Sequence, residues 1–92
     1  MADALISPDV VARYAADAAR EVDGVTGIVE GVRKGIRVED GEIELHLALR
    51  FGVSIPAVGS AVQAHVADYL EQMADSRPAA VNVVVEEVDG SD

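Results

Sequence analysis

Residues 43–51 form the most regular pattern in the chain, because apolar and polar side chains alternate there without a break. The positions on one side of an extended chain are all large and apolar: Ile43, Leu45, Leu47, Leu49 and Phe51. The positions between them are polar or small: Glu44, His46, Ala48 and Arg50. Since successive side chains of a strand point to opposite faces, the pattern predicts a strand with one face buried and the other in water. Burying the five apolar side chains contributes on the order of 10 kcal/mol before chain entropy is subtracted, at about 1.5–3 kcal/mol each.

Two further strands are predicted around this one. Asp40-Gly41 separates the β-prone stretch 36–39 from the alternating stretch. Both residues tolerate the positive φ angles of a two-residue turn, so the pair predicts a β-hairpin. A β-branched run at 81–88 predicts the last strand. Residues 25–29 fit either a further short strand or a loop.

Helices are predicted on both sides of the hairpin. The first spans roughly residues 8–23, with Ser7-Pro8 as N-cap and first-turn proline and with Gly24 as a left-handed cap at its end. The second begins near Pro56. Its apolar face recurs at helical spacing: Val58, Val62, Val66, Tyr69 and Met73.

The order of these elements is helix, strand, strand, helix, strand, which predicts an α+β fold. We expect a small antiparallel or mixed sheet with both helices packed on one face, an arrangement loosely like that of KH domains. With 92 residues, the chain is long enough for one domain, here residues 1–92 with an ordered core at about 5–89.

Composition limits the partners. Seventeen acidic and seven basic residues give a formal charge of −10, which repels nucleic acid and anionic lipid. There is no cysteine, no signal-peptide pattern and no apolar run near the length of a membrane span. We therefore expect a cytoplasmic protein without direct membrane insertion.

Gly24-Val25-Thr26-Gly27 matches the GxxG backbone clamp of KH domains, which grips nucleic acid. This stretch carries no cation, however, and is predicted to join a helix to a strand. A helix cap followed by a turn is therefore the favoured interpretation. A KH-like nucleic-acid-binding module is kept as the alternative function, and salt-dependent retention of RNA would identify it.

No residue set predicts chemistry. His46 and His65 do not have metal-ligand spacing, the acidic residues are spread along exposed faces, and the serines have no GxSxG context. We predict no catalytic, cofactor-binding or metal-binding residues and no enzymatic activity. Metal analysis of the purified protein is the direct check on the two histidines.

Basic residues gather at one place. Arg33, Lys34 and Arg37 fall within five positions, and Arg50 is predicted on the neighbouring strand. Ordinary charge balance against nearby glutamates is the favoured interpretation. The functional interpretation is docking to an acidic partner, including a second copy of this chain.

Four motifs in order carry a family resemblance: Gly24-Val25, Phe51-Gly52, Val62-Gln63 and Val81-Asn82-Val83. Over about residues 5–89 the chain resembles the alkaline-shock (general-stress) family of bacterial envelope stress response proteins. The resemblance implies a non-catalytic scaffold that acts by protein–protein interaction, cytoplasmic and peripheral at the inner face of the membrane. It implies a membrane-anchored partner protein or a paralogue, with homo-oligomers as a second option. It also implies that Gly24-Val25 is a joint between helix and strand and not a ligand loop.

Overall fold

The computed structural model describes residues 7–30 and 35–90 and confirms the α+β fold and the predicted order of elements. It also shows that residues 25–28 form a strand. The elements are α1 (Pro8–Glu21), β1 (Val25–Ile28), β2 (Ile36–Glu39), β3 (Glu42–Arg50), α2 (Ile55–Ala74) and β4 (Ala80–Asp89).

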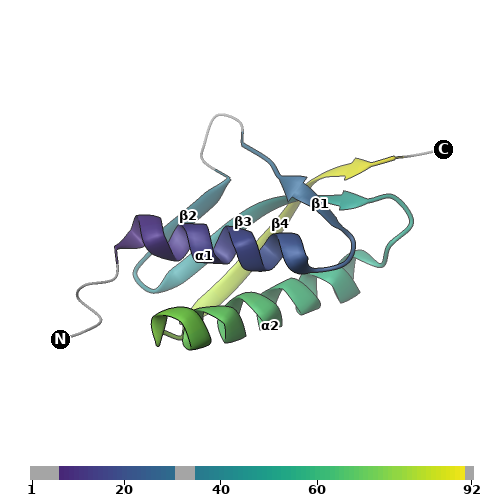
Figure 1. Cartoon of the computed structure of the whole chain (residues 1–92). Helices are drawn as coiled ribbons and strands as arrows, with labels where there is room; N and C mark the ends of the chain where they lie inside the picture. Colours follow the sequence, from purple (N-terminus) through teal and green to yellow (C-terminus); the bar gives the residue numbers. More distant parts are fainter. Residues whose placement is uncertain (1–6, 31–34, 91–92) are drawn as a thin grey trace.

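The sheet is mixed and is built around β3. β1 and β2 lie one after the other along the same edge of β3, both antiparallel to it. β4 pairs with the other edge of β3 in parallel, from Glu42↔Ala80 to Arg50↔Asp89. Both helices lie on one face of the sheet, with α2 as the crossover between the parallel strands (Figure 1). In the described part of the chain, the opposite face therefore carries no helix.

α1 begins at the predicted Ser7-Pro8 signal. α2 begins one residue before the predicted Pro56, and its N-cap is Ser54. The Ser7 hydroxyl accepts a hydrogen bond from the Val10 N–H (3.2 Å), and the Ser54 hydroxyl accepts one from the Ala57 N–H (3.3 Å). α1 ends at Glu21, two residues earlier than predicted, because Val22 is already extended.

The two predicted positive-φ sites are confirmed. Gly24 has a φ of +101°, although it lies beyond the helix cap and does not form it. Asp40 and Gly41 have φ angles of 53° and 78°, as a two-residue hairpin turn requires.

The core lies between the helices and the sheet. Its fully buried large side chains are Ile43, Leu45, Leu47, Leu49, Val62, Val66 and Leu70. Two predicted core residues are instead exposed. Phe51 is 49% exposed because β3 ends at Arg50 and the chain turns there. Met73 is 51% exposed because the inward position in the last turns of α2 is taken by Leu70.

Candidate functional site: the open face of the sheet

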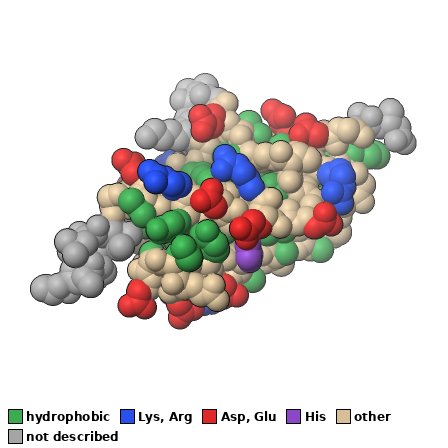
Figure 2. All heavy atoms as spheres, in the orientation of Figure 1, with side chains coloured by type: hydrophobic (Ala, Val, Ile, Leu, Met, Phe, Trp, Pro, Cys, Tyr) green, Lys and Arg blue, Asp and Glu red, His purple; other side chains and the backbone are tan. Residues whose placement is uncertain are grey.

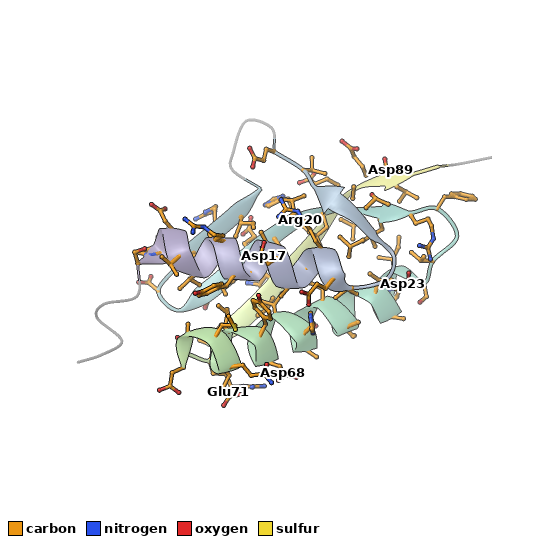
Figure 3. The ribbon with its side chains drawn as sticks, in the orientation of Figure 1. Asp17, Arg20, Asp23, Asp68, Glu71 and Asp89 are labelled. Carbon is orange, nitrogen blue, oxygen red and sulfur yellow. The ribbon has the colours of Figure 1, made fainter. Side chains whose placement is uncertain are left out.

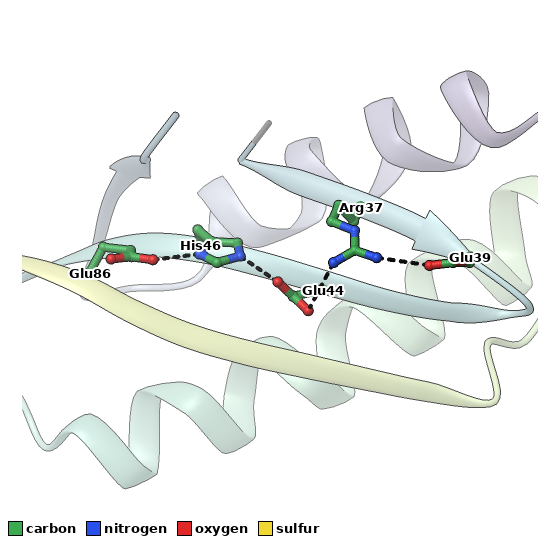
Figure 4. A network of polar contacts seen from close by, with 5 residues as sticks. All are labelled: Arg37, Glu39, Glu44, His46 and Glu86. Atoms are coloured by element: carbon green, nitrogen blue, oxygen red, sulfur yellow. Dashed lines mark hydrogen bonds and ion pairs between the residues drawn. The ribbon is translucent and has the colours of Figure 1, made fainter. Parts of the chain in front are cut away.

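The sheet face opposite the helices, which we call the open face, carries a continuous row of charged side chains. Figure 4 shows its five members, which come from three strands: Arg37 and Glu39 on β2, Glu44 and His46 on β3, and Glu86 on β4. The alternation of β3 places Glu44 and His46 on this face because Ile43, Leu45 and Leu47 occupy the buried one.

Strand register brings the row together. Arg37 is the Cα partner of Glu44, and His46 is the Cα partner of Val84. The His46 backbone is fixed where β1 and β2 meet, because its N–H donates to the Gly35 carbonyl and its carbonyl accepts from the Val29 N–H, both at 2.8 Å. The imidazole is therefore attached to a rigid backbone position at the centre of the sheet.

Three of the four contacts in the row are at hydrogen-bond distance, and the fourth is a longer ion pair. Arg37 Nη2 lies 2.8 Å from Glu39 Oε1, and Arg37 Nη1 lies 4.0 Å from Glu44 Oε1. His46 Nε2 lies 2.5 Å from Glu44 Oε2, and His46 Nδ1 lies 2.6 Å from Glu86 Oε2. The hydrogen bond to Glu86, followed by that to Glu44, raises the pKa of His46 above 6.5, because both carboxylates stabilise the protonated ring.

A second polar tie crosses the open face nearer the end of β3. The Thr26 hydroxyl on β1 donates to Asp89 Oδ2 on β4 (2.6 Å), so it joins strands on the two sides of β3. Ala48 is the small open-face residue of β3 at this level and is only 5% exposed. Arg50 Nη1 lies 3.5 Å from Asp23 Oδ1 at the same end.

The row is not arranged to hold a metal ion. The two ring nitrogens of His46 point in opposite directions, so Glu44 and Glu86 cannot both join the imidazole around one ion. Across residues 7–30 and 35–90, no group of three or more His, Asp or Glu side chains could do so. A hollow of about 160 Å³ lies beside Arg37, Glu44 and Asn82, which is small against the usual range of about 300–1,000 Å³ for ligand pockets.

The helical side of the molecule carries charged side chains of both signs and an apolar patch. Figure 2 shows acidic side chains spread over this side, with Lys or Arg side chains among them and hydrophobic side chains gathered in between. Figure 3 places Asp17 and Arg20 on α1 and Asp68 and Glu71 on α2. His65 on α2 lies 2.8 Å from Glu21 on α1, so the second histidine belongs to a helix–helix hydrogen bond on the side opposite the open face.

Of the four predicted docking cations, the structure describes Arg37 and Arg50. Arg33 and Lys34 lie outside the described residues. Arg37 and Arg50 both belong to the sheet, but Arg37 is paired with Glu44, six positions from Arg50, or about 20 Å along β3. Each already has an acidic neighbour, Glu39 for Arg37 and Asp23 for Arg50.

The outer edge of β4 is a feature that the sequence did not predict. β4 is ten residues long, and in the described part of the chain β3 is its one strand neighbour. Gln63 Nε2 donates to the Val81 carbonyl (2.9 Å), which therefore faces outward. Since backbone groups alternate between the two edges of a strand, those of Val83 and Val85 face outward as well. The β-branched run predicts the strand, but only its pairing with β3 on one side shows that it is an edge strand.

The GxxG stretch is part of the fold in this structure. Gly24 is buried, and its carbonyl accepts a hydrogen bond from the Arg50 N–H (2.8 Å). Gly27 belongs to β1 and pairs with Ala48. Both glycines are thus engaged with β3, as the interpretation of a joint between helix and strand requires.

Comparison with known proteins gives a family and a fold. The family model described as "Asp23 family, cell envelope-related function" matches residues 2–90; its name is unrelated to the residue Asp23 of this chain. YqhY of Bacillus subtilis (strain 168) is 38% identical over 85 residues, a match that covers 74% of this chain and 63% of YqhY. The chain thus spans less than two thirds of this curated relative.

Solved structures of the MamM C-terminal domain have the same fold. The structure of MamM residues 215–293 superposes with a TM-score of 0.59 at 21% identity, covering 86% of this chain and 96% of that one. A variant of the domain gives a TM-score of 0.62 at 21% identity, covering 88% and 98%. At this identity the likeness concerns the fold alone.

Proposed function

Because this chain belongs to the Asp23 family, whose described function relates to the cell envelope, we propose that it is a non-enzymatic scaffold of the envelope stress response. It acts by protein–protein interaction on the cytoplasmic side of the membrane. Its partner is a membrane-anchored protein or a paralogue.

Charge supports attachment through a partner and not through lipid. The chain has 17 acidic and seven basic residues, and anionic headgroups repel such a surface. Within residues 7–30 and 35–90, neither helix offers an apolar stretch that could cross a bilayer. A protein partner at the membrane would bring the chain there without a basic surface or a membrane-spanning helix.

The observation that carries the proposal is the outer edge of β4. An edge strand presents unpaired backbone donors and acceptors to which another chain can add a strand. The end of β4 is protected against this, because Glu86, Glu87 and Asp89 are charged and the register shifts at Glu86. The stretch 82–85 has no charge and no proline, and Val84 in it is 37% exposed.

These features describe the partner segment. It is an extended strand that bonds to the outward backbone groups of Val83 and Val85. Apolar side chains in it would match the valines of β4, and basic residues would match Glu86 and Glu87. Arg37 and Arg50, with Arg33 and Lys34 from the remainder of the chain, are the cations proposed to contact acidic groups of the partner.

The test compares two lysine substitutions on the same strand. Val84→Lys places a charge in the unprotected stretch, and Val88→Lys, at a site 44% exposed, places the same charge where β4 is already guarded. Tagged wild-type and variant proteins are expressed, lightly crosslinked and fractionated into membrane and soluble material, after their melting curves have shown that both variants fold.

We expect wild-type protein and Val88→Lys in the membrane fraction, crosslinked to one membrane protein or paralogue, and Val84→Lys in the soluble fraction. Equal retention of the two variants would remove the β4 edge from the proposal. Wild-type protein found only in the soluble fraction, with RNA that salt releases, would favour a nucleic-acid-binding module instead.

A further inference from the structure

His46 is held between two carboxylates on the open face. Nδ1 lies 2.6 Å from Glu86 Oε2, Nε2 lies 2.5 Å from Glu44 Oε2, and the imidazole is 17% exposed (Figure 4). An ionised carboxylate only accepts hydrogen bonds, whereas a neutral imidazole has one N–H and one bare nitrogen. Both contacts are hydrogen bonds only when the ring is a doubly protonated imidazolium, which donates at each nitrogen.

The charged groups around the ring come from three strands. Glu44 is on β3 with His46, Glu86 and the adjacent Glu87 are on β4, and Arg37 on β2 reaches Glu44 at 4.0 Å. The helices lie on the other face and contribute no charge here. Among the described residues, the ring therefore has carboxylates as direct neighbours and the nearest paired cation, Arg37, beyond Glu44.

The two carboxylates are not equivalent. Glu44 keeps Arg37 when the imidazole becomes neutral, and its side chain is 32% exposed. Glu86 has no other ion pair among the described residues, and its side chain is 42% exposed. The unprotonated ring nitrogen then faces a carboxylate lone pair, and the two repel each other. Glu86, the more exposed of the two glutamates, is the one that can move into water. Loss of the proton therefore breaks the contact with Glu86.

Glu86 occupies the weak point of β4. Leu47 pairs with Val85 and Ala48 pairs with Glu87, so Glu86 is the extra residue of a bulge and has no Cα partner on β3. Every residue from Glu86 to Asp89 is exposed. Beyond the bulge, the strand is held by the ladder to β3 and by the bond from the Thr26 hydroxyl to Asp89.

We propose that protonated His46 fastens the C-terminal half of β4, Glu86–Asp89, to β3, and that loss of the ring proton releases it. A partner strand bound at 82–85 is then held more weakly once the ring is neutral, because Glu86 and Glu87, which its basic residues are proposed to match, no longer have a fixed position. This second step rests on the proposed function, whereas the first step does not.

Proton titration of His46 by NMR tests the first step. We expect the His46 midpoint to lie above the ordinary histidine pKa of 6.5. Glu86→Gln should lower the His46 midpoint, whereas Glu87→Gln, which changes the adjacent acid, should leave it nearly unchanged. A His46 midpoint at or below 6.5, or equal effects of the two variants, would overturn the proposal.

Amide hydrogen exchange, corrected for the intrinsic effect of pH, reports the release itself. The amides of Glu87 and Asp89 should lose protection severalfold as pH rises through the His46 midpoint, while those of Asn82 and Val84 should not. Glu86→Gln should remove this pH dependence. Constant protection at Glu87 and Asp89 in the wild-type protein would show that the strand is not released.

The second step is tested with membranes from the same cells. Retention of wild-type protein on these membranes should fall over the pH range in which His46 titrates, and retention of Glu86→Gln should not follow that range. If exchange shows the release but retention is constant with pH, the second step is wrong and the first stands. If no protein is retained at any pH, the proposed function fails independently of the release.

Discussion

Alanine substitutions at two glycines should change stability in opposite directions. Gly24 has a φ of +101°, which residues with a Cβ rarely adopt. A Cβ there would lie 3.0 Å from Val58 Cγ2 and 3.4 Å from Val53 Cγ1, and Val58 is only 8% exposed. Gly59 is in α2 without a positive φ, and a Cβ there meets nothing within 4 Å.

The magnitudes follow from these two environments. Gly24→Ala incurs backbone strain of about 1–3 kcal/mol and overpacking against Val58 of about 1–3 kcal/mol. With partial relaxation, we expect a loss of about 2–4 kcal/mol in the free energy of unfolding. Gly59→Ala should gain about 0.5–1 kcal/mol, because alanine favours the helix and restricts the unfolded chain.

Thermal and urea unfolding measure both effects. At about 4–8 °C per kcal/mol for a domain of this size, Gly24→Ala should lower Tm by roughly 8–30 °C and Gly59→Ala should raise it by roughly 2–8 °C. Gly27→Ala is the matched control within the GxxG stretch, since its Cβ also meets nothing and its φ is not positive. A Gly24→Ala protein as stable as Gly27→Ala would refute the packing argument.

Two further predictions concern the core and the open face. Leu47 is fully buried, so Leu47→Ala should cost about 2–5 kcal/mol of unfolding free energy and Leu47→Asp should unfold the domain. Val84→Ala on the open face should cost less than about 1 kcal/mol. Circular dichroism and urea unfolding check this order, and a folded Leu47→Asp would contradict it. The pKa of His46 is raised in the folded state, so its stabilisation is fully present below pH 6.5 and is lost as pH rises through the folded-state pKa. The difference in unfolding free energy between wild type and Glu86→Gln should therefore shrink over that window, and a difference constant with pH would contradict this assignment.

Local signals in the sequence predicted much of the fold. The alternation in β3, the proline near the start of each helix and the Asp-Gly turn each depend on residues close together in the chain, and all three appear in the structure. β1 has no such signal. It is a strand because Val25, Gly27 and Ile28 find partners on β3.

The open-face site depends on register, which the sequence alone does not provide. The alternation of β3 predicts that His46 lies on the solvent-facing side of the strand, and the structure confirms this. Its partner Glu86, however, lies 40 residues away in the sequence. Glu86 reaches the ring only because β4 runs parallel to β3 and carries a bulge at that level. Exposed acids in a sequence with 17 of them are ordinarily solvated, so no pattern distinguished Glu86 from the others.

The parallel pairing of β4 has a consequence for synthesis on the ribosome. The hairpin of β2 and β3 can form as soon as it leaves the exit tunnel, because its contacts are local. β4 supplies Val81, Val83 and Val85 to the core and cannot pair with β3 until the whole of α2 has been translated. Until then β3 has an unpaired edge of nine residues in a nascent chain, and this is the interval in which a chaperone or a second nascent chain could bind it.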